Sequence, residues 1–219
     1  MTVIEWTVVA ALLLSLERAC YVWTWRYTES FRAFCARPAV ARWGEPVRVL
    51  ELLFYGFKAI QIGVFVGWCW GVGTFPLARR PPIALGLGLA AIAVGQTLSF
   101  AVFRRLGRVG VFYGTRLGHV VPWCTGFPFS ILRHPQYVGA VLSIWGFFLS
   151  LRFPAPDWIV LPTLETLFYV IGGRLESHAP TDVLGAGQGA CRALLVQGDA
   201  ESDGDLAYRG VRGAQIASD

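Results

Sequence analysis

The chain alternates long apolar runs with short polar segments. A helix needs roughly 20 residues to cross a hydrocarbon core about 30 Å thick. Three apolar runs have about this length, at residues 3–23, 49–71 and 82–103. Each is therefore predicted to be a transmembrane helix.

Two shorter apolar runs follow, at residues 137–153 and 158–172. Between them stand Pro154, Ala155, Pro156 and Asp157, a sequence that cannot continue a helix. They are predicted to form a helical hairpin. The expected fold class is all-α, a polytopic membrane helical bundle with four to five transmembrane helices.

The composition changes after Ser177. Residues 178–219 are rich in glycine, carry mixed charge and lack apolar periodicity. Such a segment cannot bury enough apolar surface to fold. We therefore expect a membrane-embedded domain at residues 1–177 and a disordered C-terminal tail at residues 178–219.

Arginine placement predicts the orientation, because loops rich in arginine stay in the cytosol. Such residues cluster in two loops, and a turn that holds Arg79 and Arg80 would lie on the opposite face. With five spans, the region after Arg174 also returns to the cytosolic side. The clustered residues are Arg26, Arg32, Arg37, Arg42 and Arg48 in the first loop, and Arg104, Arg105, Arg108, Arg116 and Arg133 in the second.

Composition narrows the possible functions. Hydrophobic residues make up 55% of the 219 residues and charged residues only 15%, which is unlike a soluble globular protein. The five cysteines lack CxxC spacing and there are only three histidines, so neither a metal site nor a disulfide framework is expected. The net charge of +5 is carried mainly by arginines in predicted loops, which fits a membrane surface better than a nucleic acid.

Charged residues inside predicted spans are costly and need partners. Glu51 and Lys58 are seven residues apart and share a helix face, so we expect a structural network between helices. Glu165 precedes Glu176 by about three helical turns. It would line the same cleft if the helix continues through Gly172 and Gly173.

Gly110, Gly114 and Gly118 recur every four residues, which on a helix would place them on one face. Such a face lets another group approach the backbone closely. Helix packing through small residues is one interpretation. A cofactor-binding surface, flanked by Tyr113 and Arg116, is the other.

A second motif reads Arg133-His134-Pro135-Gln136-Tyr137-Val138-Gly139. Pro135 suits the first turn of a helix that begins near His134. A helix N-terminus offers free N–H groups and the positive end of the helix dipole, which favour a carboxylate or another anion. Arg133 and His134 are therefore candidates for ligand binding, although both could instead face headgroup phosphates.

This RHPxYxG element resembles that of the isoprenylcysteine carboxyl methyltransferase superfamily, and some sterol reductases contain a similar one. A longer string that runs from Tyr113 to Gly139 resembles one branch, the plant-like phosphatidyl-N-methylethanolamine N-methyltransferases. The string comprises Tyr113-Gly114-Thr115-Arg116-Leu117-Gly118, Pro122-Trp123, Phe127-Pro128-Phe129 and Pro135-Gln136-Tyr137-Val138-Gly139. Weaker resemblance extends to Glu17-Arg18-Ala19-Cys20-Tyr21, Gly95-Gln96 and Leu175-Glu176-Ser177.

The resemblance implies S-adenosylmethionine-dependent N-methylation of phosphatidylethanolamine derivatives, chiefly the mono- and dimethyl intermediates, on the way to phosphatidylcholine. It implies that S-adenosylmethionine is held by a small-x-glycine element, a glycine-rich segment and acidic residues. Here these correspond to Gly95, residues 110–118 and Glu176. Ala93 replaces the first glycine of the first element, and Ser177 replaces the second acidic residue of the last.

Three rivals remain: an isoprenylcysteine carboxyl methyltransferase-like enzyme, which the Phe127-Pro128-Phe129 context disfavours, a sterol-type reductase, and a catalytically silent membrane scaffold. The reductase usually has more spans than 219 residues can form. The expected partners are a phospholipid substrate and the membrane, most simply the endoplasmic reticulum with the active site facing the cytosol. No nucleic acid, metal or obligate protein partner is expected.

The chemistry assigns candidate residues to three roles. His134 is a candidate base for the amine, with Glu176 or the phosphate of the lipid as alternatives. Aromatic faces suit a quaternary ammonium. The candidates are His134 and Glu176 for catalysis; Gly95, Gly110, Gly114, Gly118, Arg133, Tyr137 and Glu176 for the cofactor; and Arg116, Trp123, Phe127 and Phe129 for the substrate.

Overall fold

The computed structural model describes residues 2–71, 81–121 and 126–177. The predicted tail at 178–219 and the candidate Trp123 lie outside this part of the chain. The chain divides into one unit of residues 1–119 and 124–179 and another of residues 120–123 and 180–219. All the described helices and the cavity among them belong to the first unit.

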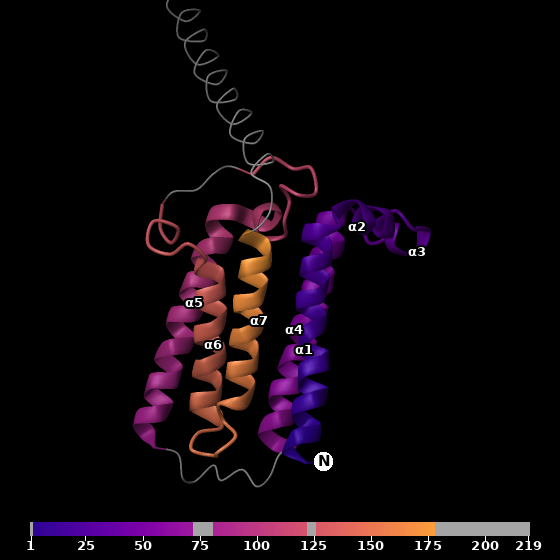
Figure 1. Ribbon diagram of the computed structural model, residues 1–219. Coiled ribbons are helices and arrows are strands. Elements are labelled where there is room, and N and C mark those ends of the chain that lie inside the picture. Colours follow the sequence, from indigo (N-terminus) through magenta and orange to yellow (C-terminus); the bar gives the residue numbers. More distant parts are fainter. Residues whose placement is uncertain (1, 72–80, 122–125, 178–219) are drawn as a thin grey trace, which may run out of the picture. The chain divides into compact units, whose positions relative to one another are not determined.

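The described residues form helices and no strands, so the all-α prediction is confirmed. Of the helices in the described residues, five are long and two are short. In Figure 1 the long helices run beside one another, and the short ones lie at one end of the bundle. The predicted runs at 3–23, 49–71 and 82–103 are helical throughout, and those at 137–153 and 158–172 are helical except for residues 152–153 and 158–159. The helices are α1 (Val3–Arg26), α2 (Thr28–Cys35), α3 (Pro38–Ala41), α4 (Pro46–Gly71), α5 (Pro82–Val111), α6 (Pro135–Leu151) and α7 (Val160–Ser177).

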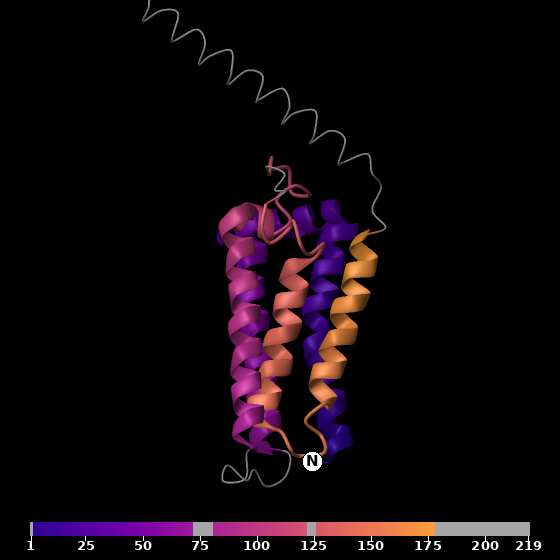
Figure 2. The same ribbon diagram turned by 90° about the vertical axis from the view of Figure 1, so that its left-hand side faces the viewer.

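Two of the described helices, α4 and α5, are long and apolar enough to cross a membrane, and α6 is a shorter apolar helix. Successive long helices alternate in direction, as Figure 2 shows for α5, α6 and α7. As a result α2, α3, residues 112–119 after α5, residues 126–134 before α6 and the end of α7 lie at the same end of the bundle. This end is called the loop end below.

Local sequence explains where two helices begin. Thr2 caps α1, since its hydroxyl accepts from the Glu5 N–H at 3.2 Å while the Glu5 carboxylate accepts from the Thr2 N–H at 2.8 Å. Such a capping box satisfies two N–H groups that would otherwise lack partners. Helix α6 begins at Pro135 with His134 as its N-cap, so the predicted helix start is confirmed.

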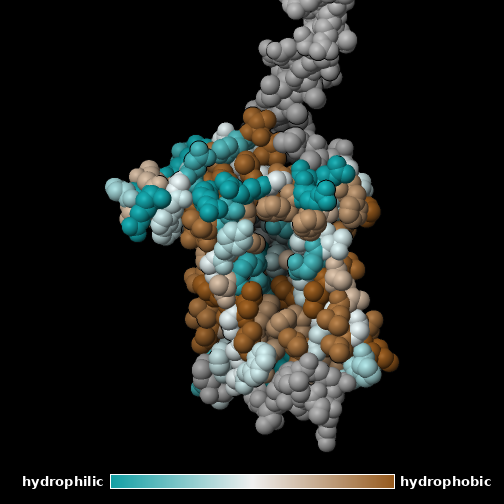
Figure 3. Space-filling view, turned by 180° about the vertical axis from the view of Figure 1, so that it is seen from behind, coloured by the Kyte–Doolittle hydropathy of each residue, from teal (hydrophilic) through white to brown (hydrophobic). Residues whose placement is uncertain are grey.

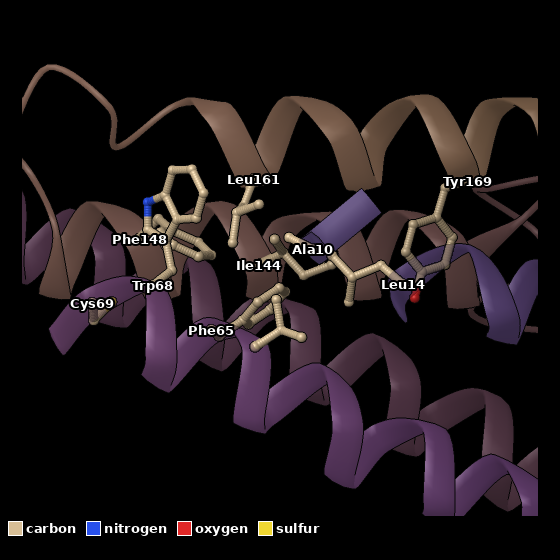
Figure 4. Packing of buried hydrophobic residues seen from close by; sticks show 10 residues of the cluster. Ala10, Leu14, Phe65, Trp68, Cys69, Ile144, Phe148, Leu161 and Tyr169 are labelled. Carbon is tan, nitrogen blue, oxygen red and sulfur yellow. The ribbon is translucent and has the colours of Figure 1, made fainter. Parts of the chain in front are cut away.

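The bundle core lies between α1, α4, α6 and α7. Leu14, Trp68, Phe148 and Leu161, one from each of these helices, belong to one buried cluster (Figure 4). Trp68, Phe148 and Leu161 are completely buried. Inside a membrane such side chains stabilise the bundle through close van der Waals packing rather than through removal from water, so this cluster fixes the positions of the four helices.

Helices α5 and α6 approach each other through glycines. A Cβ on Gly139 would lie 2.7 Å from the carbonyl oxygen of Gly95, and a Cβ on Gly88 would lie 2.7 Å from that of Gly146. The seven-residue spacing in both helices puts the two contacts on one face of each. Any larger residue would force the two backbones apart.

A second buried cluster, at the loop end, holds the segment that follows α5. Phe112 and Leu117 of this segment pack with Phe31, Cys35 and Leu50. Residues from α2 and α4 therefore fix the segment that carries the glycine pattern.

At the opposite end, Arg152 ties the α6–α7 turn to α4. Its guanidinium forms an ion pair with Asp157 at 3.0 Å and donates to the carbonyl of Cys69 at 3.3 Å. Arg152 is only 5% exposed. The predicted hairpin is thus confirmed and has an ionic contact at its turn.

Candidate active site

A cavity of about 520 Å³ lies among the helices near the loop end. Its walls come from α1, α4, α5, α6 and α7 and from the segment before α6. Seen from behind, hydrophilic side chains gather at the loop end and in a hollow between the helices, above a more hydrophobic region (Figure 3). The size is within the usual range for a site that binds a small molecule.

Five of the candidate residues line this cavity: Gly110, Phe129, Arg133, His134 and Tyr137. They come from the end of α5, the segment before α6 and the first turn of α6. The structure therefore brings the two sequence motifs together at one site.

Pro135, Gln136 and Tyr137, in the first turn of α6, line this cavity. The His134 ring stacks on that of Tyr137, with the centroids 5.8 Å apart and 18° between the planes. Tyr137 in turn contacts Tyr169 of α7 edge-on at 5.5 Å. His134 is solvent-exposed, so a soluble ligand can reach it.

The prediction that three glycines share a helix face is wrong. Helix α5 is kinked at Gly107, where φ is 62°, and it ends at Val111. Gly114 and Gly118 therefore lie in the turns that follow, and the positive φ values of Tyr113 (53°) and Gly118 (94°) exclude a continued helix. Of the three glycines, Gly110 lines the cavity.

Gly114 has a structural reason to be glycine. A Cβ there would lie 2.5 Å from the carbonyl oxygen of Val109, and the Gly114 N–H donates to that same oxygen at 2.8 Å. The residue allows the chain to turn sharply at the end of α5.

Two substrate-binding candidates lie outside the cavity lining. The Arg116 guanidinium lies over the Trp25 ring, 4.1 Å from its centroid, while the Arg116 carbonyl accepts from Arg32 at 3.2 Å. Phe127 is 46% exposed, and its carbonyl accepts from Arg105 at 3.2 Å. Both residues are thus held at the loop end, beside the site.

The other two cofactor candidates, Gly95 and Glu176, lie in α5 and α7. Gly95 is buried where α5 meets α6, and its neighbour Gln96 lines the cavity and donates to Ser143 at 3.0 Å. Glu176 belongs to the last turn of α7. Its side chain is outside the described part of the structure.

The cavity wall holds a charged cluster that the sequence predicted only through two of its members, Lys58 and Glu165. Lys58 of α4 donates to Glu17 of α1 at 3.1 Å and to Gln61 at 2.9 Å, and Gln61 donates to Glu165 of α7 at 2.6 Å. Glu17 and Glu165 are only 5% and 2% exposed. This cluster connects three helices through polar contacts inside an apolar body.

Arg18 completes this cluster. Its guanidinium lies 3.8 Å from the centroid of the Tyr169 ring and 3.6 Å from the Glu17 carboxylate. The sequence contained a signal, since adjacent Glu17 and Arg18 stand at the end of an apolar run. Their partners on other helices could not be predicted from spacing.

Glu51 and Lys58 do take part in contacts between helices, as expected, but with separate partners. Glu51 pairs with Arg48 at 2.7 Å and with Arg108 of α5 at 3.4 Å. Glu165 joins the cavity wall through Gln61, which agrees with its expected place beside the cleft.

The cavity also reaches the outer surface. Tyr55 of α4 and Phe103 of α5 both line it, and they are 54% and 42% exposed. The site therefore combines an opening between two apolar helices with cations, carboxylates and aromatic rings. Such a site can hold an amphipathic molecule by its polar end.

Comparison with known proteins gives a consistent result. The family model for phospholipid methyltransferases matches residues 83–179. A phosphatidyl-N-methylethanolamine N-methyltransferase from Arabidopsis thaliana is 32% identical over 136 residues, which cover 62% of this chain and 74% of the relative.

Two further relatives match over shorter regions. The phosphatidyl-N-methylethanolamine N-methyltransferase of Saccharomyces cerevisiae is 33% identical, over 41% of this chain and 43% of the relative. The phosphatidylethanolamine N-methyltransferase of Rattus norvegicus is 34% identical, over 44% of this chain and 48% of the relative. No solved structure matches the chain. The extent of the match to the Arabidopsis protein shows that the chain belongs to the phospholipid methyltransferase family.

Proposed function

We propose that this protein transfers methyl groups from S-adenosylmethionine to the headgroup amine of phosphatidylethanolamine derivatives, with the mono- and dimethyl intermediates as preferred substrates. The observation that carries the proposal is the cavity itself. It joins the first turn of α6, a buried charged cluster and an opening between α4 and α5. The names of the Arabidopsis and rat relatives support the same activity.

The residues of the cavity fit S-adenosylmethionine, which supplies an electrophilic methyl group on a sulfonium. The N-terminal end of α6, where the helix dipole is positive, suits its carboxylate together with Arg133. Gly110, which has no side chain, lets a ligand approach the backbone closely. In this proposal Gly95, Gly114 and Gly118 shape the wall that supports it, and Glu176 pairs with the ammonium or the ribose hydroxyls.

The amine substrate would enter between α4 and α5, where an apolar surface meets the polar interior of the cavity. Aromatic rings stabilise methylated ammonium groups without hydrogen bonds. Phe129 and Tyr137 line the cavity and would supply such faces. Arg116 and Phe127, at the loop end, would hold the headgroup from outside. Trp123 stays a substrate-binding candidate from the sequence motif alone.

Methyl transfer to an amine requires a free lone pair and an in-line approach, so positioning and exclusion of water should dominate. His134 is the proposed base, since its ring lines the cavity and is held against Tyr137. Glu176 or the phosphate of the lipid is the alternative acceptor of the proton.

The proposed topology has four to five transmembrane helices, and its support is that α4 and α5 are long and apolar enough to cross a membrane. The arginine-rich loops would face the cytosol. In this arrangement residues 1–177 form the membrane-embedded catalytic domain in the endoplasmic reticulum, and residues 178–219 form a separate C-terminal tail.

One experiment tests the activity. Microsomes that contain the inserted protein are incubated with radiolabelled S-adenosylmethionine and with phosphatidylethanolamine or its mono- or dimethyl derivative, and the lipids are then separated. Label in the mono- and dimethyl substrates is expected. Label in none of the lipids would exclude the enzyme and favour a silent scaffold.

A further inference from the structure

One charged side chain in the cavity has hydrogen-bonding capacity that no described residue uses. Arg18 is 11% exposed at its side chain, yet its Nε and Nη2 atoms have no hydrogen-bond partner. Leaving a buried charged donor without a partner is costly. A residue kept in this state inside a cavity wall suggests that a ligand supplies the missing acceptor.

The surroundings of Arg18 show why neighbouring side chains do not accept its hydrogen bonds. Its nearest carboxylate, on Glu17, is 3.6 Å away, beyond hydrogen-bonding distance, and Lys58 occupies the same carboxylate at 3.1 Å. Glu165 is engaged by Gln61 at 2.6 Å. Both acidic side chains of the cluster are therefore already bonded.

The guanidinium is held in a defined orientation. It stacks over the Tyr169 ring at 3.8 Å, and the Arg18 side chain passes along α7 at Gly172, where an added Cβ would meet its Cδ at 3.9 Å. A planar guanidinium fixed in this way can donate two parallel hydrogen bonds to a phosphate or a carboxylate. The missing ligand group is therefore an oxyanion.

We propose that Arg18 binds the phosphodiester of the phospholipid substrate and anchors a headgroup subsite, with Lys58 as the second cation. This inference rests on the proposed function, because it names how that substrate is held. The acceptor amine lies two carbons from the phosphate in every phosphatidylethanolamine derivative. Anchoring the phosphate therefore limits how far the amine can move within the cavity.

The carboxylate of S-adenosylmethionine is the other possible oxyanion. Along the cavity wall, however, two aromatic rings stand between His134, at the start of α6, and Arg18. His134 contacts Tyr137, Tyr137 contacts Tyr169, and the Arg18 guanidinium lies over Tyr169. The wall thus has two separate oxyanion positions, one for each ligand. Arg18 and Lys58 of α4 both contact Glu17, and Tyr55 at the opening is one helical turn from Lys58, so the position at Arg18 is assigned to the lipid.

The test uses the full chain in mixed micelles with phosphatidyl-N-methylethanolamine and radiolabelled S-adenosylmethionine. Arg18→Gln should raise the KM for the lipid by about tenfold or more, since it removes a charge-assisted contact. Its KM for S-adenosylmethionine should stay within about twofold of the wild-type value. Arg42→Gln, at an exposed arginine outside the cavity, is the matched control and should change neither constant.

A second lipid tests the phosphate itself. A diether lipid that carries an N-methylaminoethyl ether instead of the phosphodiester should be a poor substrate for the wild type. The Arg18→Gln variant should methylate the phosphodiester lipid and the ether lipid at more similar rates than the wild type does. The preference of Arg18→Lys for the phosphodiester lipid should lie between those of the wild type and of Arg18→Gln, because an ammonium cannot make the bidentate contact. Arg18→Lys replaces Arg18→Gln in the test if the glutamine variant does not fold.

The outcomes separate the two proposals. If the wild type methylates no lipid, the proposed function fails. If the wild type is active but the Arg18 variants keep its lipid KM and its discrimination, the headgroup subsite is wrong. A rise in the KM for S-adenosylmethionine alone would assign Arg18 to the methyl donor and would also overturn the inference.

Discussion

Lys58 of α4 and Glu17 of α1 form an ion pair at 3.1 Å within the helical bundle. Their side chains are 27% and 7% exposed, and Lys58 is the only lysine in the chain. Ionisable groups inside a membrane protein are costly unless they are paired. The pair therefore connects the two helices electrostatically at the place where they form one wall of the cavity.

Replacing one residue of this pair should destabilise the protein more than replacing both. Lys58→Met leaves the Glu17 carboxylate buried and without its hydrogen-bonded cation, at an expected cost of about 3–5 kcal/mol. The double variant Glu17→Gln/Lys58→Met should lose less than the sum of the two single variants. Unfolding of the purified protein in detergent measures all four forms.

The control for this cycle is the exposed pair Arg32 and Glu29, which are 39% and 86% exposed at their side chains. Glu29→Gln should leave the unfolding midpoint unchanged, because solvent screens such pairs. Additive effects of the two single substitutions at Glu17 and Lys58 would show that the buried pair has no coupling.

The close approach of α5 and α6 gives a second prediction. Gly139→Ala puts a Cβ 2.7 Å from the Gly95 carbonyl oxygen and should lower stability by about 1–3 kcal/mol. Gly86 of α5 has nothing within 4 Å of an added Cβ. Gly86→Ala should therefore be neutral or stabilising, by up to about 1 kcal/mol. Thermal unfolding of both variants measures the difference, and equal destabilisation would contradict the predicted contact.

The helices could be predicted because their signals are local. The apolar run at 82–103 and the proline at the start of α6 are signals contained in short stretches of sequence. Helices α5 and α6 are present where these signals predicted them. The glycine pattern failed for a local reason too. Gly107 and Tyr113 adopt positive φ. The four-residue spacing of the glycines did not predict that the helix would kink at Gly107 and end before Gly114.

The cavity could be predicted only in part. Arg133 and His134 were found because they stand in a contiguous motif. Arg18, Gln61 and Lys58 acquire their role from packing between helices that are distant in sequence, and Gln61 bonds to a residue 104 positions away. Spacing within one helix carries no information about such a partner.

The turn between α6 and α7 gives a third prediction. Asp157→Asn removes the carboxylate that pairs with the buried Arg152 at 3.0 Å. The expected loss is about 1.5–3 kcal/mol, as for a hydrogen bond to a charged group. Because the turn lies at the end of the bundle away from the cavity, the KM values for both substrates should not change. Unfolding and steady-state kinetics of the same preparation test both parts, and a raised KM would contradict the separation of turn and site.

The proposed base gives the last prediction. If His134 accepts the amine proton, His134→Ala should lower kcat by about 100-fold or more, while the KM for the lipid changes little. His119→Ala is the matched control, since His119 does not line the cavity and its loss should leave kcat unchanged. In His134→Ala the amine must lose its proton to water, so its rate should rise about tenfold per pH unit below the pKa of the lipid amine. Steady-state methylation rates between pH 6 and about 9 measure this slope. Wild-type kcat in His134→Ala at neutral pH would assign proton removal to Glu176 or to the phosphate of the lipid instead.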